Sequence, residues 1–155
     1  MIFPASQIVT HQDKHWIYYN GYRERHGIGE RGPHGIGLAT LKLDRFIGLQ
    51  ARGESGTVVT KPFVLQGNGL EMNLDARAGA VRVELLDQNA NPLPGFAGAN
   101  APTYKDVDDL RFKPAWKGHK NLSALRGKVV RVRFTLHNAK LYAFQIGVGS
   151  PFGAR

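Results

Sequence analysis

Apolar and polar side chains alternate through residues 127–146, whose sequence is GKVVRVRFTLHNAKLYAFQI. A period of two is typical of a strand with one buried face. We predict two antiparallel strands joined by a three-residue loop at 138–140, because a two-residue loop would split the apolar residues between opposite faces. The expected cross-strand pairs are Leu136 with Tyr142, Phe134 with Phe144, and Val132 with Ile146. These pairs would form the central hairpin of a β-sandwich.

The rest of the sequence predicts further strands and almost no helix. Strand patterns occur at residues 8–11, 16–19, 36–43, 57–65, 70–74, 81–85 and 110–116. We expect hairpins at 7–21 and 70–85, an irregular stretch at 95–109, and a single helical turn at 121–125. Nineteen glycines and eight prolines suit many short strands and tight turns. The predicted fold is therefore all-β, an antiparallel β-sandwich of the jelly-roll or concanavalin-like kind.

Three strand patterns fall before the sandwich and suggest a separate N-terminal part. Three strands are too few to bury both faces of a sheet, so this part must pack against something else. We predict that residues 1–46 pack on the sandwich or on a partner, that 47–149 form the sandwich, and that 150–155 are a tail.

The charge and composition exclude some classes of protein. The formal net charge is +9, but the basic residues are scattered, which favours a solvated basic surface over a nucleic-acid site. The nucleic-acid alternative would use Lys128, Arg131 and Arg133. The absence of cysteine excludes disulfides and thiolate metal sites. No run of about 18 apolar residues suggests a membrane span, and the start MIFPASQIV lacks the features of a signal peptide, so the compartment stays open.

Three short motifs resemble cofactor or metal sites. GIGERG at 27–32 fits a dinucleotide loop, but a strand pattern follows where a helix is required. HQDKH at 11–15 lacks the glutamate of a zinc helix, and the segment 87–98 lacks the glycine and glutamate of a calcium loop. We expect no cofactor and no metal. The residues best suited to calcium are Asp106, Asp108 and Asp109, although acids in an exposed loop are more often simply solvated.

No catalytic constellation is evident, whereas aromatic residues offer a means of ligand binding. Glutamates and aspartates occur without any recognisable pairing, and no nucleophile-elbow pattern is present. Aromatic faces can stack on apolar ligand surfaces, although most aromatics in a small β domain belong to the core. The predicted ligand-binding residues are Tyr104 and Trp116, in or beside the irregular stretch, and then Trp16 and Tyr22.

The segments HWIYYNGYRERHG and GIGLATLKLDRFIGL resemble the last blade of five-bladed β-propeller glycoside hydrolases, the clan of invertases and arabinanases. Asp13, Trp16, Tyr18, Tyr19 and Gly21 match the D-x-x-W-x-Y-Y-x-G pattern of that blade. The later segments GTVVTKPFVLQGNGLEMNLDARAGAVRVELLD and LSALRGKVVRVRFTLHNAKLYAFQI resemble the β-sandwich that follows such propellers.

The resemblance implies an N-terminal propeller-blade remnant and a C-terminal sandwich, but no catalytic residue, since the family's catalytic carboxylates come from earlier blades. By this resemblance, the chain looks like the tail of such an enzyme, either as a stand-alone gene or as a fragment. We therefore expect a non-catalytic, carbohydrate-binding module. The alternatives are a homo-oligomeric structural protein that associates through its N-terminal strands, and a basic nucleic-acid-binding protein.

Overall fold

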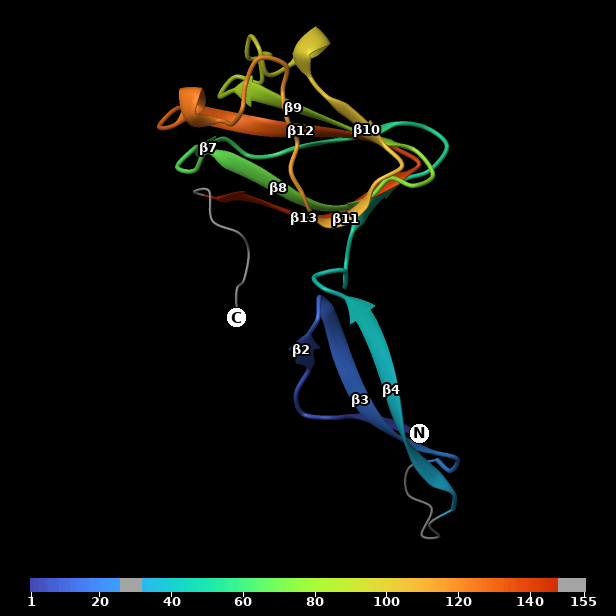
Figure 1. Cartoon of the computed structure of the whole chain (residues 1–155). Coiled ribbons are helices and arrows are strands. Elements are labelled where there is room, and N and C mark those ends of the chain that lie inside the picture. Colours follow the sequence, from blue (N-terminus) through green and yellow to red (C-terminus); the bar gives the residue numbers. More distant parts are fainter. Residues whose placement is uncertain (26–31, 148–155) are drawn as a thin grey trace. The chain divides into compact units, whose positions relative to one another are not determined.

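The computed structural model describes residues 1–25 and 32–147 and shows an all-β protein built from antiparallel sheets (Figure 1). The chain divides into two compact units, Met1–Phe46 and Ile47–Arg155. We call them the N-terminal unit and the C-terminal unit. Among the described residues, no helix has the length or the apolar character needed to cross a lipid bilayer.

The N-terminal unit is a single four-stranded sheet centred on β3 (Lys14–Tyr22). Strand β4 (His34–Lys42) pairs with β3 along its whole length. The short strands β1 (Ile2–Pro4) and β2 (Val9–His11) pair with the last and first parts of β3, so they share its other edge. The predicted hairpin at 7–21 is confirmed, with a two-residue turn at Gln12 and Asp13, whose φ angles are 48° and 59°. Strand β1 was not predicted.

The C-terminal unit is a sandwich of two sheets, visible as two layers in Figure 1. One sheet has the order β11-β8-β13-β5, and the other has the order β10-β9-β12-β6, with β7 also paired to β12. The strands are β5 (Leu49–Ala51), β6 (Gly56–Val59), β7 (Phe63–Val64), β8 (Gly69–Asp75), β9 (Ala80–Asp87), β10 (Thr103–Lys105), β11 (Asp108–Phe112), β12 (Val129–His137) and β13 (Ala139–Gly147).

The order of the strands is that of a jelly roll. The consecutive pairs β5–β6, β8–β9, β10–β11 and β12–β13 each place one strand in either sheet, at matching positions. Two four-stranded sheets connected in this way form the eight-stranded jelly roll, in which β7 continues β6 beyond Pro62. The predicted β-sandwich is therefore confirmed.

The two hairpins predicted within the sandwich are wrong. Strands β12 and β13 do not pair with each other, because β12 pairs with β9, β6 and β7 while β13 pairs with β8 and β5. Strands β8 and β9 likewise lie in opposite sheets. The single residue Asn138, with a φ of 43°, turns the chain from one sheet to the other. The apolar faces of successive strands meet across the core instead of lying side by side.

Side chains from both sheets fill this core. The largest fully buried side chains of this core are Phe134, Leu65, Met72, Leu74, Leu85, Leu122, Leu136, Val81, Val83, Val130 and Val132. Two 3-10 turns complete the unit, Gly98–Asn100 and Ser123–Leu125, and the second coincides with the predicted helical turn at 121–125. In the described part of the N-terminal unit, by contrast, no apolar side chain is buried.

Candidate functional site

A pocket of about 240 Å³ opens where β8 begins, β13 ends and the chain leaves β11. It is lined by Asn68, Gly69, Leu70, Glu71, Lys113, Pro114, Trp116, Lys120, Asn121, Leu122 and Gly147. We call it the Trp116 pocket. Its polar side chains come from two separate segments, 68–71 and 113–121, which hydrogen bonds tie together. The Leu122 amide donates to the Asn68 carbonyl at 2.8 Å, and the Asn68 amide donates to the Gly147 carbonyl at 3.0 Å.

Trp116 forms part of the pocket wall and is only 4% exposed. Its indole packs against Phe96 with ring centroids 6.0 Å apart, and Phe96 stacks on His119 at 4.1 Å. His119 lies close over Gly95, where a Cβ atom would come within 2.5 Å of the imidazole Nε2. The indole nitrogen is buried without a hydrogen-bond partner among the described residues. The tryptophan therefore shapes the pocket and does not offer an open face for stacking.

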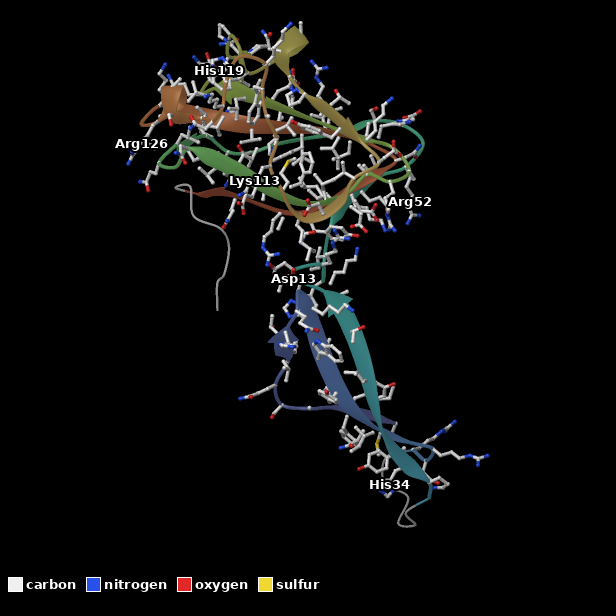
Figure 2. All side chains as sticks on the ribbon, in the orientation of Figure 1. Asp13, His34, Arg52, Lys113, His119 and Arg126 are labelled. Atoms are coloured by element: carbon white, nitrogen blue, oxygen red, sulfur yellow. The ribbon has the colours of Figure 1, made fainter. Side chains whose placement is uncertain are left out.

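The segment that carries Trp116 crosses from one sheet toward the other. Figure 2 shows Lys113 beside the sheet of β8 and β13, and His119 beside the sheet of β9 and β12. The turn from Trp116 to His119 closes with a hydrogen bond from the His119 amide to the Trp116 carbonyl at 3.0 Å. Gly118 has a φ of 80° in this turn, a conformation that glycine adopts without steric cost.

Glu71 is the acidic residue among those that line the pocket, and both of its oxygens are engaged. Lys113 Nζ lies 3.1 Å from Oε1, and Gln145 Nε2 donates to Oε2 at 3.4 Å. A glycosidase needs two carboxyl groups facing the scissile bond, about 5 to 9.5 Å apart. One paired carboxylate in the described lining does not supply that arrangement, whereas it can accept hydrogen bonds from a bound ligand.

The predicted ligand-binding residues lie in different places. Tyr104 does not line the pocket, but it contacts the segment that carries Trp116. Its hydroxyl accepts a hydrogen bond from the Ala115 amide at 2.7 Å and donates one to the Ala115 carbonyl at 3.1 Å. Trp16 and Tyr22 belong to β3 of the N-terminal unit. The Trp16 indole donates to the His11 carbonyl at 3.2 Å, and Tyr22 stacks on His34 at 5.6 Å. Of the four residues, only Trp116 lines the pocket.

Two of the three candidate calcium ligands make other side-chain contacts. Asp108 lies 3.6 Å from Arg77 Nε, and Asp109 accepts a hydrogen bond from the Arg111 amide at 2.8 Å. Asp106 adopts a left-handed conformation with a φ of 55°. Within residues 1–25 and 32–147, no group of three His, Cys, Asp or Glu side chains is placed to hold a metal ion.

The other motifs yield no additional site. The loop motif at 27–32 falls almost entirely outside the described residues. In the motif at 11–15, His15 Nδ1 lies 3.0 Å from Thr10 Oγ1, and its Nε2 accepts a hydrogen bond from the Asp44 amide at 3.2 Å. Both ring nitrogens of His15 are thus engaged within the N-terminal unit.

The arginines on the outer face of β12 have structural partners. Arg131 donates to the carbonyl oxygens of Gln88 and Thr60 at 3.0 and 3.1 Å. Arg133 Nε donates to the carboxylate of Glu84 at 2.7 Å, so part of the positive charge of this face is neutralised. A nucleic-acid site would need these guanidinium groups to be available for phosphates.

Sequence reasoning found Trp116 but missed the polar residues around it. Asn68, Lys113 and Lys120 carry no distinctive spacing, because the pocket joins segments about forty residues apart in the chain. The signal that was present is the dense polar sequence on either side of Trp116, KPAWKGHKN.

No protein-family model, curated protein or solved structure matches the chain.

Proposed function

We propose that the C-terminal unit is a non-catalytic carbohydrate-binding module and that the Trp116 pocket is its ligand site. The observation that carries the proposal is the mixed lining of this pocket. Apolar atoms of Leu70, Pro114 and Trp116 lie beside the side chains of Glu71 and Asn121. A sugar ring presents hydroxyl groups and apolar C–H groups together, so it matches a surface of this kind.

Size and fold agree with the proposal. The volume of about 240 Å³ falls below the ~300 Å³ at which pockets for larger organic ligands begin, which suits one sugar ring of a longer chain. Jelly rolls include lectin domains. That likeness is an analogy of fold alone.

The test is a calorimetric titration of the full chain with fructan, arabinan and xylan oligosaccharides. We expect binding in the millimolar range or tighter. The variant Glu71→Gln keeps the size of the side chain but removes its charge, and we expect it to weaken binding several-fold. Glu54→Gln, an exposed change away from the pocket, should leave binding unchanged. Absence of heat with every saccharide at millimolar concentration would exclude this function.

A second candidate function is self-association through the N-terminal unit, and one observation favours it. The strand registers place Phe3, Val9, Tyr18, Ile36 and Leu38 on the same face of the sheet. All five are exposed, and Ile36 is 81% exposed. Exposed apolar patches of this kind are typical of interaction sites.

The outer edge of β4 supports a second copy of the chain as the partner. No strand among the described residues pairs with this nine-residue edge, and long open edges promote strand addition. Two β4 strands can pair antiparallel over all nine residues only with Leu38 opposite Leu38. This register sets Ile36 opposite Thr40, so the apolar faces of both copies would join.

Sedimentation velocity at micromolar concentration tests this second function. We expect a dimer, and we expect Leu38→Lys to convert it into a monomer. Val64→Lys, which adds the same charge at an exposed strand position of the other unit, should leave the dimer intact. A monomeric mass for the unmodified chain would discard the idea.

A further inference from the structure

The charges around the Trp116 pocket specify its ligand more narrowly. We infer that the pocket prefers a saccharide with an anionic substituent, a carboxylate or a sulfate, over a neutral saccharide of the same size. This inference rests on the proposed carbohydrate-binding function and adds the class of ligand to it.

The charges inside the pocket do not cancel. Its described lining contains three ionisable side chains, Glu71, Lys113 and Lys120. Lys113 and Glu71 neutralise each other at 3.1 Å, and Gln145 occupies the second carboxylate oxygen of Glu71. Lys120 lines the same pocket and has no ion-pair or hydrogen-bond partner among the described residues. The pocket therefore retains one positive charge that a ligand can meet.

The segment that carries Trp116 adds positive charge around the pocket. Residues 113–128 connect β11 to β12 and contain no aspartate or glutamate. The basic residues of this segment are Lys113, Lys117, Lys120, Arg126 and Lys128. An excess of one sign of charge around a concave site raises the local concentration of ligands of the opposite sign. The segment thus reinforces the charge that Lys120 provides inside the pocket.

The lining of the pocket suits a saccharide better than a nucleic acid, which is also anionic. Proteins that bind single-stranded nucleic acids stack the bases on exposed aromatic faces. Trp116 is the aromatic residue in the described lining, and its ring is covered by Phe96 and the surrounding core. Hydrogen bonds and one charge, without a stacking platform, favour a charged sugar.

The experiment compares ligands of equal size that differ in charge. The full chain is titrated with trigalacturonate, with its fully methyl-esterified form, and with a trisaccharide whose only charge is a sulfate group. We expect both anionic ligands to bind about two- to fivefold more tightly than the ester at low salt, in line with the strength of an exposed ion pair. The difference should shrink at 0.5 M salt, because the Debye length then falls to a few ångströms.

Two lysine variants assign the preference to the pocket. Lys120→Gln should bring the affinities for acid and ester together, whereas Lys117→Gln, in the same segment but outside the lining, should keep most of the difference. Equal affinity for acid and ester would overturn the inference and leave the carbohydrate-binding function standing. A preference retained in Lys120→Gln would also overturn it. Failure of every saccharide to bind would remove the proposed function itself, whether or not the chain is retained on a DNA column.

Discussion

Tyr104 and Ala115 are joined by two hydrogen bonds, in which the phenol oxygen accepts from the Ala115 amide at 2.7 Å and donates to its carbonyl at 3.1 Å. Tyr104 lies on β10 in one sheet, while Ala115 follows β11 of the other sheet and directly precedes Trp116. The rings of Tyr104 and Phe112 also make a T-shaped contact, with their centroids 4.5 Å apart. One side chain therefore fixes the pocket segment from the opposite layer of the sandwich.

Removing the hydroxyl in Tyr104→Phe should lower the free energy of unfolding by about 1 kcal/mol, the usual net value of a hydrogen bond that water can partly replace. Saccharide affinity should fall as well, because the segment carrying Trp116 loses its anchor. Urea unfolding in a Trp16→Phe background measures the first effect, since Trp116 is then the sole fluorescent tryptophan. The matched change Tyr18→Phe, on an exposed ring of the N-terminal unit, should alter neither quantity.

Gly79 makes a second testable contact, in the turn between β8 and β9. A Cβ atom at this position would lie 1.9 Å from the carbonyl oxygen of His137 and 2.8 Å from the Cβ of Asn138. These atoms belong to the connection between β12 and β13. Gly79→Ala should therefore push the β8–β9 turn away from the β12–β13 connection. We expect a loss of about 3 kcal/mol in unfolding free energy, at the upper end of overpacking effects.

The control for Gly79→Ala is Gly35→Ala, where an added Cβ would meet no atom within 4 Å. Its effect on unfolding should stay within about 0.5 kcal/mol. Similar midpoints in urea for the two variants would show that the turn between β8 and β9 can relax around a methyl group.

The hairpin errors show what an alternating pattern can and cannot predict. The pattern at 129–137 correctly placed Val130, Val132 and Phe134 on a buried face. A period of two identifies that face but not the partner strand, because hairpin neighbours and strands facing across a core both bring apolar sets together. Asn138 decides between them by turning the chain into the other sheet. An asparagine with a positive φ is equally typical of hairpin turns, so the residue type does not reveal which connection forms.

The candidate site was even less predictable than the strand pairing. Trp116 stood out as an aromatic residue in an irregular stretch, but its burial depends on Phe96 and His119. The pairing of Glu71 with Lys113 depends on β8 and β11 being neighbours. Each of these contacts follows from the order of strands in the jelly roll, which the sequence pattern did not determine.

Glu84 is a buried acid on β9 that links the sheet to the loop covering its outer face. Its carboxylate accepts hydrogen bonds from Arg133 Nε at 2.7 Å and from the Gly98 amide at 3.0 Å, and Arg82 lies 3.7 Å away. Arg82 also donates to the Gly98 carbonyl. Burial by itself would raise the pKa of Glu84, but the bonds from Arg133 and Gly98 outweigh it and leave the pKa below its ordinary value.

The lowered pKa predicts how Glu84 contributes to stability as the pH changes. A carboxylate whose pKa is lower in the folded state stabilises the fold fully above the unfolded value of about 4.3, and the contribution is lost as the pH falls toward the folded pKa. At pH 7, Glu84→Gln should lower the free energy of unfolding by about 1–3 kcal/mol, because Arg133 then lacks its counter-charge. Near pH 3 the difference from the unmodified protein should narrow, since Glu84 itself is becoming protonated. Urea unfolding at both pH values measures this, with the exposed change Glu54→Gln as the control, and a difference that stays constant across this range would contradict the proposed role of the ion pair.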